Sequence, residues 1–213
     1  MVCSQSNAVP RRPAVVLEPP IDHHAVMRWL ANKFMRLLGW RFTGERPPHS
    51  KFVAIGAPHT SNWDFMLFLA VMSHFRIPAR VIGKHTLFRW PFGGLMRRLG
   101  VIPVHRDSGE GLVQQMIEKF ACADEMALII APEGTRKRAE YWRSGFYRIA
   151  VAAEVPIVLA FIDFPNKTAG IGSTLYPSGD IAADMEEICS FYAPFRGRHP
   201  ENQGPIRLAG GSD

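Results

Sequence analysis

The sequence predicts a single α/β domain whose mostly parallel central sheet is covered by helices on both faces. Short apolar runs rich in strand-forming residues alternate with longer segments of helical periodicity, and this alternation is typical of βαβ units. Several runs are apolar throughout, which indicates strands buried on both sides. A chain of 213 residues is long enough to bury the core of one such domain.

The composition is that of a folded protein with a basic balance. Twenty-five Lys and Arg stand against 19 Asp and Glu, which favours anionic partners such as phosphates, acidic lipid surfaces or nucleic acid without choosing among them. Three widely spaced cysteines predict neither a disulfide framework nor a metal knuckle, so we expect a reducing cytosol. No apolar run suits a signal peptide or a membrane span, so we expect only peripheral membrane contact.

The start and the end of the chain are expected to lie outside the domain. Residues 1–20 are rich in proline and predict a disordered lead-in. Residues 21–41 predict an amphipathic helix with Trp29 and Phe34 on its apolar face and arginines opposite. This helix either lies on a membrane surface or packs on the domain. Residues 42–193 are the predicted α/β domain, and 194–213 a loose tail.

The first predicted strand, 52–57, carries a histidine just beyond its carboxyl end, where ligands gather in open α/β sheets. Asp64 lies five positions after His59, and a carboxylate that accepts one ring proton leaves the other nitrogen free to deprotonate a hydroxyl. The same stretch also fits a capping box, in which Ser61 starts a helix and Asp64 reaches back to it. The stretch alone does not decide between a general base and a helix cap.

The remaining elements alternate as the fold class requires. Ser108, Ser144 and Asp180 are the predicted caps of three later helices. The predicted strands are 80–83, 101–104, 126–131 and 155–162, and the predicted helices are 65–75, 109–123, 145–153 and 181–192.

Polar residues follow three of the strands, in the sequences PHTSNWD, HRD and PEGTR. They offer a histidine with its carboxylate, the two arginines Arg106 and Arg136, and a Glu-Gly-Thr loop. Arginine binds phosphate bidentately and stays charged, so we predict a phosphorylated substrate whose hydroxyl is activated. Arg106 would lie near His59 if their strands were neighbours. No GxSxG sequence occurs, which argues against a serine acyl-enzyme and favours direct transfer.

These blocks resemble the glycerolipid acyltransferases of the lysophosphatidate acyltransferase type. Their order and spacing agree with that family over roughly residues 50–165. The four blocks are HxxxxD at His59 to Asp64, a glycine, strand and arginine at Gly100 to Arg106, EGTR at Glu133 to Arg136, and a Val-Pro-Ile-Val strand at Val155 to Val158. The chain departs from the family at flanking positions that concern packing more than chemistry, namely Pro58, Ala131 and Leu159, where Asn, Phe and Pro are frequent.

The resemblance implies that His59 deprotonates the acceptor hydroxyl while Asp64 holds His59. The oxygen would attack the thioester of acyl-CoA or acyl-carrier protein, a co-substrate, with no cofactor and no metal. The acceptor would be a lysophospholipid, first of all 1-acylglycerol-3-phosphate, at an anionic membrane surface of the cytoplasm, with no nucleic acid as partner. The residues that would bind the glycerol phosphate part of the acceptor are Arg106, Glu133, Gly134, Thr135 and Arg136.

Alternatives remain open at this stage. A non-catalytic lipid-binding protein would use the same basic, amphipathic surface, although it would not need the His and Asp. A metal-dependent hydrolase would need ligands at metal spacing beyond His59, Asp64 and His105. Glycerol 3-phosphate or another lysolipid is an alternative acceptor. Arg106 could instead pair with Asp107 at the surface, and Glu133 could simply brace its loop.

Overall fold

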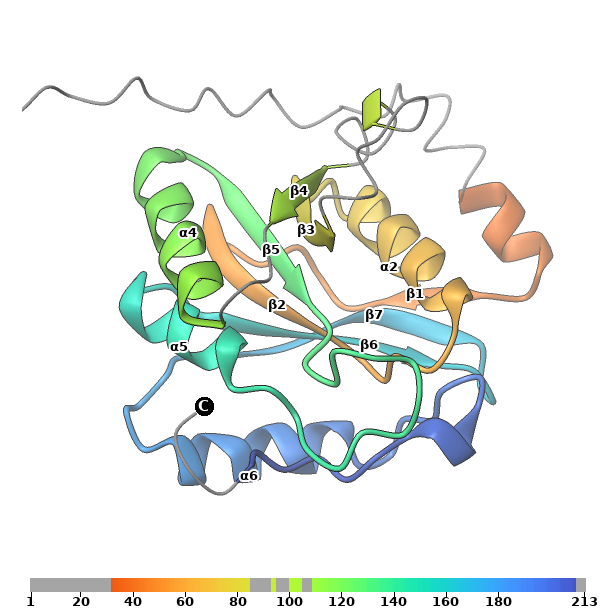
Figure 1. The fold of residues 1–213 in the computed structure, drawn as a ribbon. Coiled ribbons are helices and arrows are strands. Elements are labelled where there is room, and N and C mark those ends of the chain that lie inside the picture. Colours follow the sequence, from red (N-terminus) through yellow and green to blue (C-terminus); the bar gives the residue numbers. More distant parts are fainter. Residues whose placement is uncertain (1–31, 85–92, 95–99, 105–108, 210–213) are drawn as a thin grey trace, which may run out of the picture.

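A computed structural model of the chain describes residues 32–84, 93–94, 100–104 and 109–209 (Figure 1). The predicted lead-in, the first part of the predicted amphipathic helix, and Arg106 lie outside the described residues.

The described residues form a seven-stranded sheet in the order β1-β7-β6-β2-β5-β3-β4. Its strands are β1 (Arg41–Thr43), β2 (Lys51–Ala57), β3 (Ala79–Lys84), β4 (Val101–Val104), β5 (Met126–Ile130), β6 (Ile157–Asp163) and β7 (Thr168–Leu175). Strands β6, β2, β5, β3 and β4 are parallel to one another. The edge differs, because β7 is antiparallel to β6 and β1 is parallel to β7.

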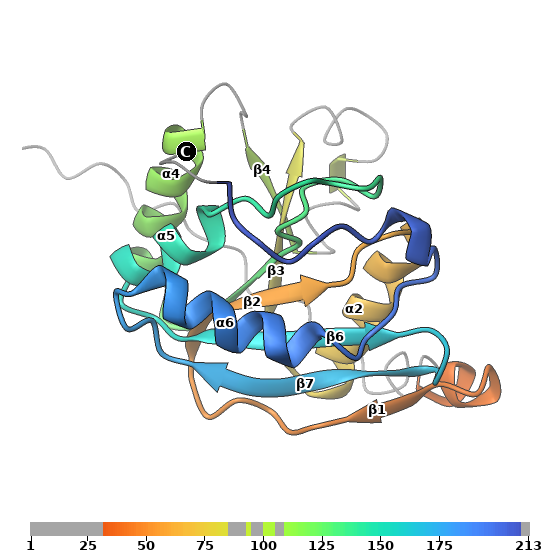
Figure 2. The same cartoon turned by 90° about the horizontal axis from the view of Figure 1, so that it is seen from below.

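Helices cover both faces of the sheet, as Figures 1 and 2 show. Helix α2 (Asn62–His74) packs on one face, and α4 (Gly109–Cys122), α5 (Gly145–Ala152) and α6 (Ile181–Tyr192) pack on the other. In Figure 2, α6 passes in front of the strands β2 and β6. The predicted α/β fold, with a mostly parallel sheet between helices, is therefore confirmed.

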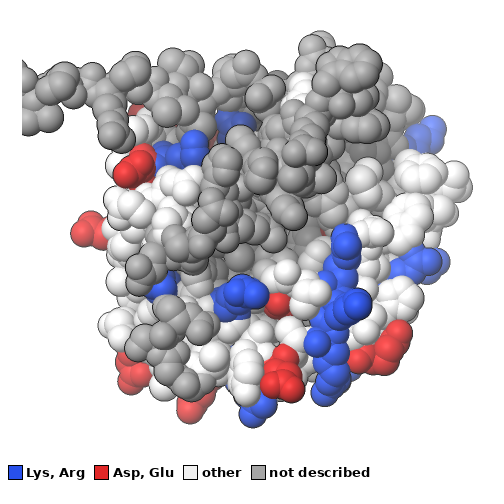
Figure 3. Space-filling model, viewed as in Figure 1, with Lys and Arg blue, Asp and Glu red and all other residues white. Residues whose placement is uncertain are grey.

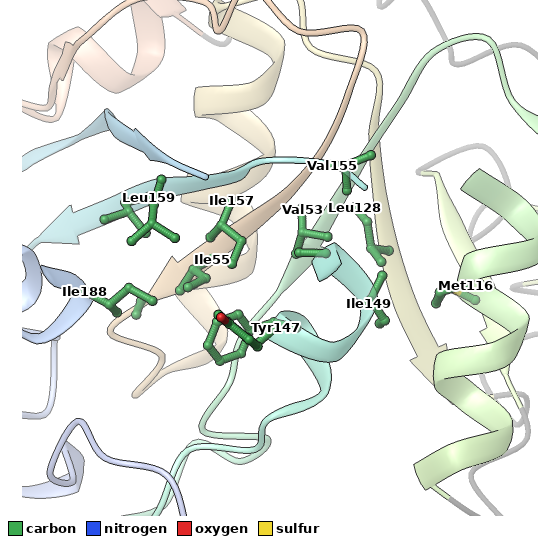
Figure 4. Packing of buried hydrophobic residues seen from close by; sticks show 14 of the residues in the cluster. Val53, Ile55, Met116, Leu128, Tyr147, Ile149, Val155, Ile157, Leu159 and Ile188 are labelled. Atoms are coloured by element: carbon green, nitrogen blue, oxygen red, sulfur yellow. The ribbon is translucent and has the colours of Figure 1, made fainter. Parts of the chain in front are cut away.

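The core divides into two layers because neighbouring residues of a strand point to opposite faces. Val53 and Ile55 of β2 pack with residues of α4, α5 and α6 (Figure 4), whereas Phe52 and Ala54 pack with α2. All four side chains are at most 2% exposed. This double burial explains why the central strands are apolar throughout instead of alternating with polar residues.

Of the predicted helix caps, Asp180 is confirmed and Ser144 is not. Asp180 caps α6 as predicted, because its carboxylate accepts hydrogen bonds from the amides of Ala182 and Ala183. Ser61 is the N-cap residue of α2. Ser144 precedes α5, but its side chain makes no capping hydrogen bond and its backbone is already helical. Ser108 lies outside the described residues.

The edge strands β1 and β7 are absent from the predicted strands. The prediction extends the amphipathic helix to residue 41, where β1 begins, and has no element between residues 162 and 181. The glycines of β7 explain the second error. A Cβ on Gly170 would lie 2.0 Å from the carbonyl oxygen of Thr43, and a Cβ on Gly172 would lie 2.2 Å from the ring of Phe191. The glycines thus mark the close approach of β1 and α6 to β7, not turns.

The C-terminal segment, defined here as residues 194–209, differs from the expected loose tail. The ring of Phe195 stacks on Phe161 with 4.2 Å between centroids. Farther along, the amide of Trp142 donates a 2.7 Å hydrogen bond to the carbonyl of Arg207. The segment contains no helix or strand of hydrophobic period, so the sequence predicts a loose tail although the structure fastens it to the domain.

The described end of the predicted amphipathic helix, residues 32–37, is helical. Met35 packs against the core layer of α2, while Phe34 and Leu37 of the predicted apolar face are 54% and 83% exposed. Within the described residues, no helix combines the length and hydrophobicity needed to cross a bilayer.

Candidate active site

Two of the polar sequences meet because β2 and β5 are parallel neighbours and end at the same edge of the sheet. His59 follows β2, and Glu133 follows β5. The backbone amide of His59 donates a 3.0 Å hydrogen bond to Oε1 of Glu133. The guanidinium of Arg136 donates to Oδ1 of Asn62. The structure therefore brings PHTSNWD and PEGTR into direct contact.

His59 lies against Asp64, with Nδ1 of the imidazole 3.3 Å from Oδ2 of the carboxylate. The two atoms are close enough to attract each other, but they are not aligned as a hydrogen bond, and Nδ1 has no other partner among the described residues. Catalytic hydrogen bonds are often loose before substrate binds. The side chain of His59 is 20% exposed, whereas Asp64 is fully buried. This arrangement leaves part of the imidazole accessible.

Asp64 serves the helix and the histidine at the same time. Its Oδ2 accepts hydrogen bonds of 2.6 and 2.7 Å from the amides of Thr60 and Ser61, and its Oδ1 accepts one of 2.6 Å from the Ser61 hydroxyl. Burial by itself raises the pKa of this carboxyl, but the contact with the His59 ring and the hydrogen bonds from Ser61 and Thr60 outweigh burial and lower the pKa below its ordinary value. Asp64 is therefore an anion near neutral pH that completes the capping box of α2 and contacts His59, and the general-base role of His59 stays a prediction.

Glu133 turns its carboxyl group inward. Oε1 accepts from the His59 amide, while Oε2 is buried without a partner in the described part of the chain. Burial raises the pKa of Glu133 to about 7, although its hydrogen bond with the His59 amide lowers it, and the charge of Asp64 adds to the rise. This contact makes Glu133 a brace for the backbone of His59. Its predicted contact with the acceptor stays a prediction.

The rest of the EGTR loop lies at the surface. Gly134 has a φ of +66°, and a Cβ there would lie 2.8 Å from Nε of Arg143, so the position requires glycine. The hydroxyl of Thr135 accepts a 3.2 Å hydrogen bond from the amide of Lys137. Figure 3 shows Lys and Arg side chains grouped at the lower right, on the side where the loop after β5 projects in Figure 1.

An open depression of about 410 Å³ lies beside this loop. Its floor includes the first residues of α2, and its rim includes Arg136. It is lined by Thr60, Ser61, Asn62, Trp63, Arg136, Arg198, His199 and Asn202. The last three belong to the C-terminal segment, and the sequence prediction missed them. The basic run FRGRH is the signal that could have drawn attention to them.

Arg106 and His105 lie outside the described residues, and the position of their strand corrects one expectation. Strand β4 is not a neighbour of β2, because β5 and β3 lie between them. The adjacency that would have placed Arg106 beside His59 is therefore not found. Among the described residues, no three His, Cys, Asp or Glu side chains are grouped so that they could hold a metal ion.

Comparison with known proteins decides the family. Residues 39–162, more than half of the chain, match the Acyltransferase family. The chain belongs to the acyltransferase family. This match contains the HxxxxD and EGTR sequences of the acyltransferase and ends before the C-terminal segment.

A solved structure also resembles this acyltransferase. The crystal structure of the 1-acyl-sn-glycerophosphate (LPA) acyltransferase PlsC from Thermotoga maritima matches with a TM-score of 0.55 and 18% sequence identity, over 77% of this chain and 73% of that chain. At this identity the likeness shows a shared fold. No curated protein matches the chain. The predicted family resemblance is thus confirmed by the family match, and the fold agrees with it.

Proposed function

We propose that this acyltransferase transfers a fatty acyl group from an acyl thioester to the free hydroxyl of a lysophospholipid, with 1-acylglycerol-3-phosphate as the preferred acceptor. The observation that carries the proposal is the partly exposed imidazole of His59 held 3.3 Å from a buried, ionised carboxylate at a basic surface. The similar fold of PlsC from Thermotoga maritima adds support, since PlsC is a 1-acyl-sn-glycerophosphate (LPA) acyltransferase.

His59 would act as the general base of the transfer. Nε2 takes the proton of the acceptor hydroxyl, and the oxygen attacks the carbonyl carbon of the thioester. The carbon–sulfur bond then breaks, and the leaving thiolate of CoA or acyl-carrier protein recovers the proton from the imidazolium. Asp64 stabilises the positive charge on the ring in between, and its lowered pKa keeps it ionised for this task.

The acceptor phosphate would bind to arginine. Arg136 lines the depression next to the motif, and its planar guanidinium suits a phosphate monoester. Arg106 remains a second proposed ligand on the strength of the family resemblance. Gly134 and Thr135 would shape the loop that presents Arg136.

Peripheral contact with an anionic membrane completes the proposal. The net charge of +6 favours such a surface. The exposed apolar side chains of Phe34 and Leu37 lie on the short helix at residues 32–37 and that of Leu38 directly follows it, where all three would insert at the lipid interface.

The first test is the variant His59→Ala in an assay of CoA release from acyl-CoA with lysophosphatidate. We expect turnover to fall by about 10²–10⁴-fold, the usual contribution of a general base. His49→Ala is the matched control, since His49 precedes β2 and contacts Tyr176 at the opposite end of the strand. A folded His59→Ala variant with full activity would contradict the proposal.

The acceptor is tested by a panel of lysophosphatidate, glycerol 3-phosphate and a lysolipid without a free phosphate monoester. We expect the highest kcat/KM for lysophosphatidate. Binding of the protein to vesicles without turnover of any acyl-CoA or acyl-carrier protein donor would favour the non-catalytic alternative instead.

A further inference from the structure

The depression beside α2 is lined by two arginines, and one of them, Arg198, lies outside the sequence motifs of the family. Arg136 reaches the depression from the loop after β5, and Arg198 reaches it from the C-terminal segment. The guanidinium carbon of Arg198 lies 5.7 Å from the centroid of the Trp63 ring, within the range of a cation–π contact. No carboxylate is among the described lining residues, so these two positive charges face the depression without an acidic partner in its wall.

The backbone on both sides of Arg198 is fastened. The amide of Gly197 donates a 3.2 Å hydrogen bond to Oε1 of Gln203, and the amide of His199 donates one of 3.2 Å to the hydroxyl of Thr60. Gly197 also packs directly on Thr60, since a Cβ there would lie 2.5 Å from that hydroxyl oxygen. Arg198 is therefore positioned by contacts with the HxxxxD sequence itself, while its side chain stays exposed.

The lining chemistry suits a phosphate better than an acyl chain. Apart from Trp63, the depression is lined by hydroxyl, amide, imidazole and guanidinium side chains. Guanidinium groups bind phosphate oxygens in pairs, and an arginine held on an aromatic ring loses less freedom when it binds. Asn62 at the start of α2 lies in the same wall, and its Oδ1 accepts a hydrogen bond from Arg136, which holds that guanidinium at the depression.

We propose that Arg198 is a phosphate-binding residue of this acyltransferase and that, with Arg136, it makes the depression a subsite for a phosphate monoester. The inference rests on the proposed function, and it adds a residue that lies beyond residues 39–162, the part of the chain that matches the family. The phosphate belongs either to the acceptor or to the CoA of the donor, and separate kinetic measurements distinguish the two.

The kinetic test compares Arg198→Ala with Arg207→Ala. Arg207 is a matched control because it is also exposed and also lies over a ring, that of Tyr141 at 5.1 Å, away from the depression. We expect Arg198→Ala to raise one KM about tenfold with little change in kcat, the loss of one charge-assisted hydrogen bond at an exposed site. Arg198→Lys should recover part of the loss, and Arg207→Ala should behave as wild type.

The substrate whose KM changes identifies the phosphate. A higher KM for lysophosphatidate at saturating acyl-CoA assigns the subsite to the acceptor. A higher KM for acyl-CoA, with no change for an acyl-carrier protein donor, assigns it to CoA. Unchanged KM values for both substrates in Arg198→Ala would overturn the proposal.

A binding measurement separates this inference from the proposed function. Inorganic phosphate and sn-glycerol 3-phosphate are titrated into each protein at low salt by calorimetry, with glycerol as the uncharged control. We expect Arg198→Ala to bind both phosphates about tenfold more weakly than wild type, whether or not the chain turns over a lysolipid. Equal phosphate binding by wild type and Arg198→Ala would exclude the subsite even in an active acyltransferase.

Discussion

At the scale of single residues, the site groups three ionisable side chains, those of His59, Asp64 and Glu133, around the short turn between β2 and α2. Asp64 accepts hydrogen bonds from Thr60 and Ser61, and Glu133 accepts one from His59. Burial by itself would raise the pKa of both carboxyl groups, and only at Asp64 do favourable contacts outweigh it. Asp64 accepts several and its pKa is lowered, while Glu133 keeps one oxygen without a partner and its pKa rises to about 7.

The raised pKa of Glu133 predicts a stability that depends on pH. A carboxyl whose pKa is higher in the folded than in the unfolded chain costs stability as the pH rises from the unfolded value of 4.5 to the folded value of about 7. Glutamine keeps the acceptor oxygen and does not ionise. We therefore expect Glu133→Gln to gain stability over wild type between pH 5 and pH 8, by up to about 3 kcal/mol.

Urea unfolding at the two pH values measures this difference. Glu140→Gln, at an exposed position next to the same loop, is the control for the loss of one negative charge. A gain of Glu133→Gln that is equal at pH 5 and pH 8 would show that the carboxyl ionises normally in the folded chain.

The sequence predicts part of this residue-scale picture. The spacing of His59 and Asp64 suggested both a helix cap and a general base, and the structure shows one carboxylate in contact with both partners. Arg198 was not predicted because it lies in a segment without hydrophobic period, and because its neighbour Thr60 is 138 positions earlier in the sequence. Only the fold reveals contacts of that separation.

At the scale of elements, the C-terminal segment supports the site. Gly197 packs against the buried side chain of Thr60, which belongs to the HxxxxD sequence. The segment then lies along residues 138–142, where the guanidinium of Arg138 donates a 2.8 Å hydrogen bond to the carbonyl of Gln203. It therefore connects the loop after β2 with the loop after β5.

We expect Gly197→Ala to destabilise the fold by about 1–3 kcal/mol, because the added methyl group would meet Thr60 within 3.0 Å. Turnover should fall as well, since Thr60 adjoins His59. Gly145→Ala is the matched control, at a position with open space at the start of α5, and it should leave stability equal or slightly higher. Thermal unfolding and CoA release measure both effects. A Gly197→Ala variant as stable and as active as Gly145→Ala would contradict the packing argument.

The predicted elements agree with the structure where periodicity was strong. The central strands were recognised because full burial makes them apolar, and α6 was recognised from its cap and its period. The edge strands were missed because β1 is only three residues long and β7 contains two glycines. The sequence does not predict strand order either, so only the structure shows that β5 and β3 lie between β4 and β2.

At the scale of the whole molecule, the basic and the apolar parts of the described surface lie on different elements. The depression and the EGTR loop are basic, whereas the helix at residues 32–37 exposes apolar side chains. The helix is tied to α2, since Nδ1 of His74 lies 3.1 Å from Oδ1 of Asn32. A membrane bound through this helix would therefore lie at a fixed orientation to α2 and the site.

This arrangement predicts that the double variant Phe34→Ser/Leu37→Ser binds anionic vesicles at least about tenfold more weakly than wild type, because two side chains no longer enter the lipid interface. Turnover of a soluble short-chain substrate should stay unchanged. Val151→Ser, which removes an exposed apolar side chain from α5, is the control. Vesicle sedimentation measures binding, and equal loss of binding and soluble turnover would show that the helix belongs to the core.

The contact between Gly197 and Thr60 has a consequence for biosynthesis. His59 and Asp64 are translated well before the segment that packs on their motif and carries Arg198, because Thr60 and His199 lie 139 positions apart. A nascent chain therefore cannot complete the wall of the depression until residues 197–202 have also been synthesised.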